Sequence, residues 1–149
     1  MIYARYALWA IAAGALIPVM AVLNARLGRV LGEPAHAGVV LLAVGLTCAV
    51  LACVMLTGGL PDVGRLASIA PIDLAGGAIV AFYVFSITIL APRFGLGNAI
   101  LFVVAAQIVT AAAIDHFGLL GAAIRPVTPL RAVGLVILIA GLAVAQLAA

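Results

Sequence analysis

The sequence has very few charged residues. Only 7% of its 149 residues are Asp, Glu, Lys or Arg; four are acidic, and all seven basic residues are Arg because the chain has no Lys. So little charge cannot cover the surface of a water-soluble domain. The chain also has no basic stripe with interleaved aromatic residues, so the sequence excludes a nucleic acid as partner.

Groups of residues that would carry catalysis, hold a cofactor or bind a metal are missing too. His36 and His116 lie in different loops, expected on opposite sides of a membrane, so they cannot form a metal pair. Cys48 and Cys53 point in different directions along one apolar segment, so we expect buried free thiols rather than a disulfide. No nucleophile with a base and no phosphate-binding glycine loop is present. The sequence therefore predicts no enzyme, no cofactor and no metal.

Apolar residues make up 68% of the chain, and the mean hydropathy is +1.45. Five apolar segments are each long enough to cross a hydrocarbon core about 30 Å thick. We therefore predict an all-α membrane protein with a single five-helix membrane domain over residues 1–149. The expected transmembrane helices span residues 6–24, 35–57, 73–91, 96–117 and 129–147.

The distribution of the arginines does not strongly favour either orientation of the chain in the membrane. Five spans place the termini on opposite sides, with Arg5, Arg65, Arg125 and Arg131 on the N-terminal side and Arg26, Arg29 and Arg93 on the other. Loop Lys and Arg residues set the orientation of a helical membrane protein, and this difference is small. Two alternatives remain: dual topology, in which copies insert both ways and pair antiparallel, and a fixed orientation set by one Arg or by a partner.

Two of the expected helices carry glycines on one face. Gly38 and Gly45 lie in the second helix, and Gly134 and Gly141 lie in the fifth. Such faces let another helix approach closely. We expect these glycines to pack helices within the unit or between the two units of a dimer.

Several polar residues inside the spans are candidates for substrate contact. Gln107 falls near the middle of the fourth span, with Thr110 beside it. An amide at that depth needs partners, either a substrate or a neighbouring helix, and both alternatives stay open. Further candidates are Asn24, which follows an expected break at Pro18 and would otherwise cap the first helix, and Tyr83 with Ser86 and Thr88 in the third.

Asp115 and His116 lie near the end of the fourth span. Asp115 is the candidate carboxylate for proton coupling, with His116 as a relay. The alternative is structural, because an interfacial Asp before a Gly-rich turn often caps a helix or pairs with an Arg, here Arg125 or Arg131. The first span has no Glu like the one that small multidrug pumps use to exchange protons for cations, which disfavours that mechanism.

Motifs along the whole chain resemble those of one family. Residues 14–28 (GALIPVMAVLNARLG) precede Glu33-Pro34-Ala35, and APRFG at 91–95 precedes Gln107, DHFGLLG at 115–121, Arg125-Pro126 and RAVGL at 131–135. These motifs resemble the YdcZ-like small five-helix family of the drug/metabolite transporter superfamily. The chain departs from that family at Met20 and Asp73, where Gln and Trp are frequent.

The resemblance implies a multi-pass protein of the bacterial inner membrane that forms half of an inverted-repeat ten-helix transporter. A second copy, or a sister five-helix chain, would complete it as an antiparallel dimer. We therefore expect a secondary transporter that moves a small molecule by alternating access. The alternatives are a small dual-topology ion channel and a non-transporting membrane subunit that needs a partner chain.

Overall fold

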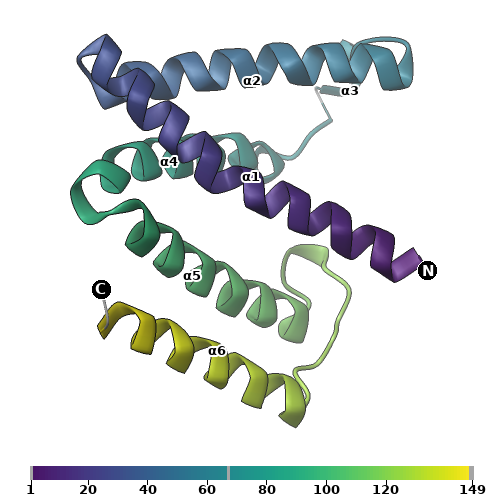
Figure 1. The fold of residues 1–149 in the computed structure, drawn as a ribbon. Coiled ribbons are helices and arrows are strands. Elements are labelled where there is room, and N and C mark those ends of the chain that lie inside the picture. Colours follow the sequence, from purple (N-terminus) through teal and green to yellow (C-terminus); the bar gives the residue numbers. More distant parts are fainter. Residues whose placement is uncertain (1, 67, 148–149) are drawn as a thin grey trace. The chain divides into compact units, whose positions relative to one another are not determined.

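The computed structural model describes residues 2–66 and 68–147, and over these residues it is built from helices and connecting turns (Figure 1). The elements are α1 (Ile2–Leu31), α2 (Pro34–Thr57), α3 (Val63–Leu66), α4 (Pro71–Phe94), α5 (Leu96–Phe117), the short 3-10 helix η1 (Leu119–Gly121) and α6 (Pro129–Leu147). The described residues contain five helices that are long and apolar enough to cross a membrane. The predicted all-α class with five such helices is confirmed.

The first helix differs most from the expectation. It runs unbroken through Pro18 and continues past Asn24 to Leu31, a length of 30 residues. The expected break at Pro18 and the expected helix end at Asn24 are therefore wrong. A proline removes one backbone hydrogen bond, but an unwound segment between apolar flanks would leave several more polar backbone groups unpaired in lipid. Asn24 is thus an interior helical residue and caps nothing.

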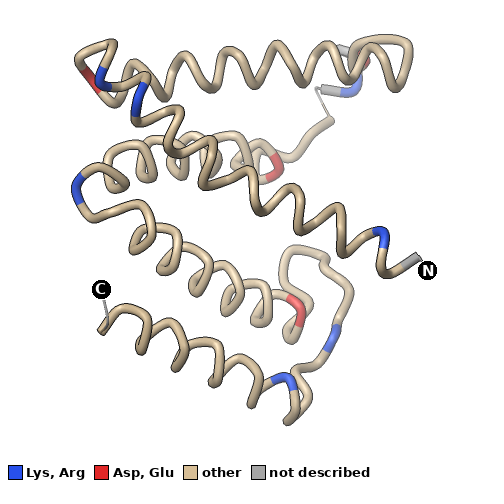
Figure 2. Tube along the Cα trace, viewed as in Figure 1, with Lys and Arg blue, Asp and Glu red and all other residues tan. Residues whose placement is uncertain are grey.

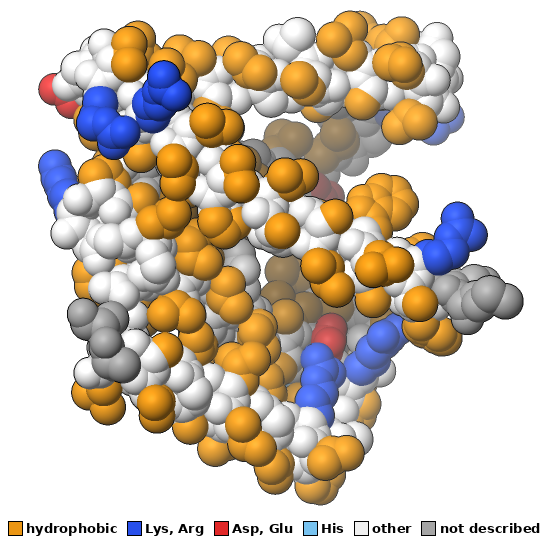
Figure 3. Space-filling model, in the orientation of Figure 1, with side chains coloured by type: hydrophobic (Ala, Val, Ile, Leu, Met, Phe, Trp, Pro, Cys, Tyr) orange, Lys and Arg blue, Asp and Glu red, His pale blue; other side chains and the backbone are white. Residues whose placement is uncertain are grey.

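Charged residues lie at or near the ends of the long helices, and the middles of these helices carry none (Figure 2). On the face drawn in Figure 3, many apolar side chains lie along the helices between the charged residues. Leu46, Phe82 and Val136, for example, are 66%, 75% and 66% exposed. Such apolar exposure suits a hydrocarbon environment, which does not solvate charge. Cys48 is exposed and Cys53 half-buried on this surface, so the expectation that both thiols are buried is wrong.

The chain divides into two compact units, Met1–Leu96 and Gly97–Ala149, which we describe separately. In the first unit α1, α2 and α4 pack on one another. Their contact surfaces consist largely of small side chains, and the buried apolar residues are Ala21, Ala37, Val84, Ile87 and Ala91. Small residues let membrane helices approach closely, which increases van der Waals contact between them.

Two glycines mark the closest approaches in this unit. A Cβ atom on Gly38 of α2 would lie 2.5 Å from Cε1 of Phe85 in α4, and one on Gly28 of α1 would lie 3.3 Å from Cα of Pro34. By contrast, a Cβ on Gly45, Gly134 or Gly141 would meet no described neighbour within 4 Å. Gly38 therefore packs helices within the unit, whereas the expected packing at the other three glycines stays a prediction.

In the second unit α5 and α6 form an antiparallel pair, with polar contacts near each end. Asn98 and Gln146 join the start of α5 to the end of α6, and Asp115 and Arg131 join the opposite ends. The connection turns sharply at Gly118, whose φ of 61° is in the left-handed region. A Cβ atom on Gly118 would come within 2.6 Å of Cγ1 of Ile124. The left-handed backbone conformation and this close contact both require glycine at this position.

Candidate functional site

A buried pair of polar side chains joins α1 to α4 in the first unit. Asn24 and Thr88 are 3% and 1% exposed. The Asn24 Nδ2 group donates a hydrogen bond to Oγ1 of Thr88, and this hydroxyl donates in turn to the carbonyl oxygen of Val84 at 2.7 Å. Polar groups inside a membrane bundle need such partners, since lipid supplies none. The pair thus ties together two helices that are distant in sequence.

One atom of this pair has no partner. The Oδ1 atom of Asn24 is buried and accepts no hydrogen bond from the described residues. Thr88 has a single hydroxyl proton, which it gives to Val84, so Thr88 faces Asn24 as an acceptor and bonds its Nδ2. An unsatisfied buried acceptor costs about 1–3 kcal/mol. A buried polar atom that stays unsatisfied despite this cost is a candidate for binding a ligand.

Cavities lie on both sides of the polar pair. The cavity between α1 and α2 has a volume of about 400 Å³ and is lined by Leu16, Val19, Met20, Leu23, Asn24, Leu27, Val40, Leu41 and Val44. A second cavity, of about 220 Å³, lies near the ends of α1 and α4, and its lining includes Thr88, Arg29 and Arg93. The Asn24–Thr88 pair therefore stands between an apolar cavity and one with two guanidinium groups. Neither lining contains a carboxylate.

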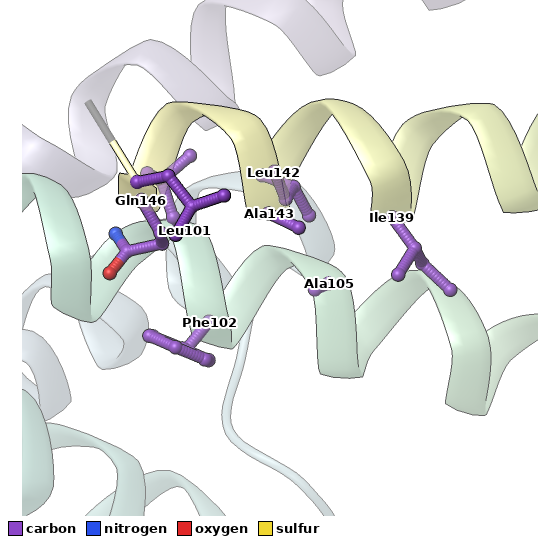
Figure 4. Close-up of a pocket in the computed structure, with 8 residues that line it drawn as sticks. Leu101, Phe102, Ala105, Ile139, Leu142, Ala143 and Gln146 are labelled. Atoms are coloured by element: carbon purple, nitrogen blue, oxygen red, sulfur yellow. The ribbon is translucent and has the colours of Figure 1, made fainter. Parts of the chain in front are cut away.

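The second unit has a cavity of its own, of about 430 Å³, between α5 and α6 (Figure 4). Its lining is apolar except for Gln146, and it consists of Leu101, Phe102, Ala105, Ile139, Leu142, Ala143, Gln146 and Leu147. Gln146 lies toward one end of this lining, and its Nε2 donates to Oδ1 of Asn98 at 2.8 Å. This amide is engaged in holding α6 to α5.

The other predicted substrate residues do not line these three cavities. Gln107 and Thr110 are exposed on α5, and neither side chain makes a hydrogen bond to another described residue. Tyr83 and Ser86 are half-buried on α4. Among the predicted substrate contacts, Asn24 lines the cavity between α1 and α2, and Thr88 lines the cavity near the ends of α1 and α4. The roles predicted for the other four remain predictions.

Asp115 and His116 make hydrogen bonds to the segment that connects α5 to α6 and to the start of α6. Asp115 Oδ2 accepts a hydrogen bond from Nη2 of Arg131 at 2.9 Å, and the Asp115 carbonyl accepts one from the Arg125 amide at 2.7 Å. His116 Nδ1 accepts from the Val127 amide at 3.0 Å. The structure thus contains the Arg131 ion pair, one of the structural alternatives set out above. About a third of each side chain is exposed, so the pair contributes at most about 1 kcal/mol.

The bond between Asn98 and Gln146 is not among the contacts predicted from the sequence. Both are amides near the ends of apolar segments, and the segments are consecutive. Consecutive helices with a short connection usually run antiparallel, which brings the start of one beside the end of the next. That rule, applied to these two residues, would have predicted the contact.

Five membrane-length helices, charges confined to helix ends and a buried polar pair beside a cavity define a multi-spanning membrane protein. A family model described as "Putative inner membrane exporter, YdcZ" matches residues 5–144. The chain belongs to this family, which confirms the resemblance noted in the sequence. It is therefore a multi-pass inner-membrane protein of a transporter family, not of an enzyme family. Searches of curated proteins and of solved structures gave no match.

Proposed function

We propose that this chain is one half of a secondary transporter that moves a small molecule across the inner membrane by alternating access. The observation that carries the proposal is the buried Asn24–Thr88 pair, with its unsatisfied oxygen, between two cavities of the first unit. Membership in a family of exporters supports transport as the activity. A polar group retained inside an apolar membrane bundle is a candidate functional site.

The strength of the polar contact suits a carrier that changes conformation. A single side-chain hydrogen bond between membrane helices is worth roughly 0.6–2 kcal/mol. Moving α1 away from α4 would break the Asn24–Thr88 bond, and the buried residues of these two helices include the small residues Ala21 and Ala91. States that differ by a few kcal/mol are both populated, and a ligand can shift their balance.

We propose that two copies, or one copy and a sister chain, assemble antiparallel. Gly45 of α2 and Gly134 and Gly141 of α6 present helix faces with room for a close neighbour. The near balance of arginines between the two sides supports insertion in both orientations. Two five-helix units in opposite orientations would form the inverted repeat on which many transporters are built.

The test is transport by inner-membrane vesicles that contain the chain, screened with a panel of radiolabelled metabolites and drugs. A carrier gives saturable uptake of at least one compound, and preloading the vesicles with unlabelled compound accelerates uptake of the label. Flux that rises linearly with concentration and shows no counterflow would refute the carrier and favour the channel. Flux that appears only when a second membrane chain is added would favour the subunit alternative.

A further inference from the structure

The cavity between α1 and α2 is an open apolar groove whose lining contains one polar residue, Asn24; the lining residues Leu16 and Leu23 are 63% and 60% exposed. Eight of the nine lining side chains are apolar, and the ninth is Asn24. Its volume of about 400 Å³ is within the range of small-molecule sites, roughly 300–1,000 Å³. Walls of this kind favour a mainly apolar molecule, and a single polar atom fixes its orientation.

The unpaired polar atom of the lining residue Asn24 is an acceptor, and it is buried, so a ligand reaches it when the side chains over it move aside. Thr88 directs its one proton at the Val84 carbonyl, so its oxygen must receive a proton from Asn24. If the amide were turned over, Oδ1 of Asn24 would face Oγ1 of Thr88 with no proton between them. The amide orientation with Nδ2 toward Thr88 is therefore the one that makes a hydrogen bond between the two side chains, and it leaves Oδ1 unpaired.

The charge of the lining excludes ions as ligands of this cavity. No lining residue is acidic or basic. The four carboxylates of the chain belong to Glu33, Asp62, Asp73 and Asp115, and none of them lines the cavity. A cation or an anion bound here would lose its hydration without gaining a countercharge, which is costly in an apolar site.

We infer that this cavity binds an uncharged, mainly apolar small molecule whose hydroxyl or N–H group donates a hydrogen bond to Oδ1 of Asn24. This inference rests on the proposed transport function, for which it supplies the substrate class. The donor group satisfies a side-chain acceptor that is buried and unpaired among the described residues, while the apolar body contacts the leucines and valines of α1 and α2.

Two matched probes test the inference. 1-Naphthol and 1-methoxynaphthalene have the same ring system and no charge, but only the naphthol can donate a hydrogen bond. Their binding is measured by equilibrium dialysis against the protein in lipid nanodiscs, with empty nanodiscs subtracted. Wild type should bind the naphthol about tenfold more tightly, because one hydrogen bond to a buried acceptor contributes about that factor. Equal binding of the two probes by wild type would overturn the inference.

Three variants locate the effect. Asn24→Leu removes Oδ1, and the preference for the naphthol should fall to within about twofold. Thr88→Val is the matched control: it removes the partner of Nδ2 but keeps Oδ1, so the preference should remain. A preference that survives in Asn24→Leu, or that both variants abolish, would contradict a direct contact with Oδ1.

The third variant, Val40→Phe, fills the cavity from α2 while keeping Asn24 itself, and it should reduce the binding of both probes. If Asn24→Leu does not fold, the comparison of probe binding by Val40→Phe and by wild type still tests whether the probes bind in this cavity. Unchanged binding in Val40→Phe would place the probes outside this cavity and overturn the inference.

The binding experiment is independent of transport. A protein that prefers the naphthol but shows no saturable flux of any compound would refute the carrier and leave the binding site standing. Saturable transport together with equal binding of the two probes would refute the binding inference and leave the carrier standing.

Discussion

Gly38 allows the sharpest test of how the first unit is packed. Replacing it with alanine places a Cβ atom 2.5 Å from Cε1 and 2.8 Å from Cδ1 of Phe85. Real Cβ atoms do not approach other carbon atoms so closely, so either the Phe85 ring must turn or α2 and α4 must separate. Gly38 is buried and Phe85 is half-buried, so the ring can turn away from the new Cβ atom only toward its exposed side. Overpacking of this kind typically costs about 1–3 kcal/mol.

The same helix provides the matched control. Gly45 is exposed, and a Cβ atom there would meet no described neighbour within 4 Å. In a helix interior alanine is favoured over glycine by roughly 0.5–1 kcal/mol, a gain that both variants share. Gly38→Ala should therefore be less stable than Gly45→Ala by about 1–3 kcal/mol, because the overpacking cost separates them.

The assay is unfolding of the purified protein in mixed micelles, followed by circular dichroism as SDS is added. Adding Phe85→Leu to Gly38→Ala gives a double-mutant cycle, and a coupling energy of at least about 0.5 kcal/mol is expected because the two residues touch. Equal stabilities of the Gly38→Ala and Gly45→Ala variants, or a coupling energy near zero, would refute the close approach of α2 and α4 at this point.

Three further predictions follow from the other contacts. Thr88→Val leaves Nδ2 of Asn24 without a partner and should lower the free energy of unfolding by roughly 0.6–2 kcal/mol in the same titration; no change would mean that the Asn24–Thr88 bond contributes nothing. Asp115→Asn should lower it by less than about 1 kcal/mol, because the ion pair with Arg131 is partly exposed; an effect several times larger would contradict this placement. A topology reporter fused after Ala149 should be found on both faces of the membrane, and two Lys residues inserted between Gly32 and Glu33 should bring it to the cytoplasmic face alone. A reporter confined to one face before the insertion would refute dual topology.

The sequence was sufficient for those features that depend on local composition. Apolar length alone predicted five helices, and the ends of α5 and α6 agree with the expected residues 96–117 and 129–147. The end of α1 could not be predicted this way. Arg26 and Arg29 suggested that the helix stops at the membrane surface, whereas helical hydrogen bonding continues beyond it to Leu31.

The candidate site depended on contacts between distant residues. Asn24 and Thr88 were both noticed as polar residues in apolar spans, but nothing in the sequence indicates that α1 and α4 meet at these positions. The direction of the Thr88 proton, which leaves Oδ1 of Asn24 unsatisfied, depends on the position of the Val84 carbonyl. The depth of Gln107 suggested a contact with substrate or with another helix; the residue is exposed on α5, and its role stays a prediction. Composition predicts where a polar residue lies along a helix more reliably than which face it occupies.

The length of α1 sets the depth of the proposed binding site. The uncharged stretch between Arg5 and Arg26 is about 30 Å long at 1.5 Å per residue, which matches the hydrocarbon core. Asn24 then lies about 3 Å below one membrane surface, and Leu16, at the other end of the cavity lining, lies close to the mid-plane. In an antiparallel pair, each membrane surface would have one Asn24 acceptor close to it. The apolar linings of the two cavities would both extend to the mid-plane. A ligand would then cross by passing from one Asn24 to the other, and the two-fold axis would make its first and last binding steps chemically equivalent.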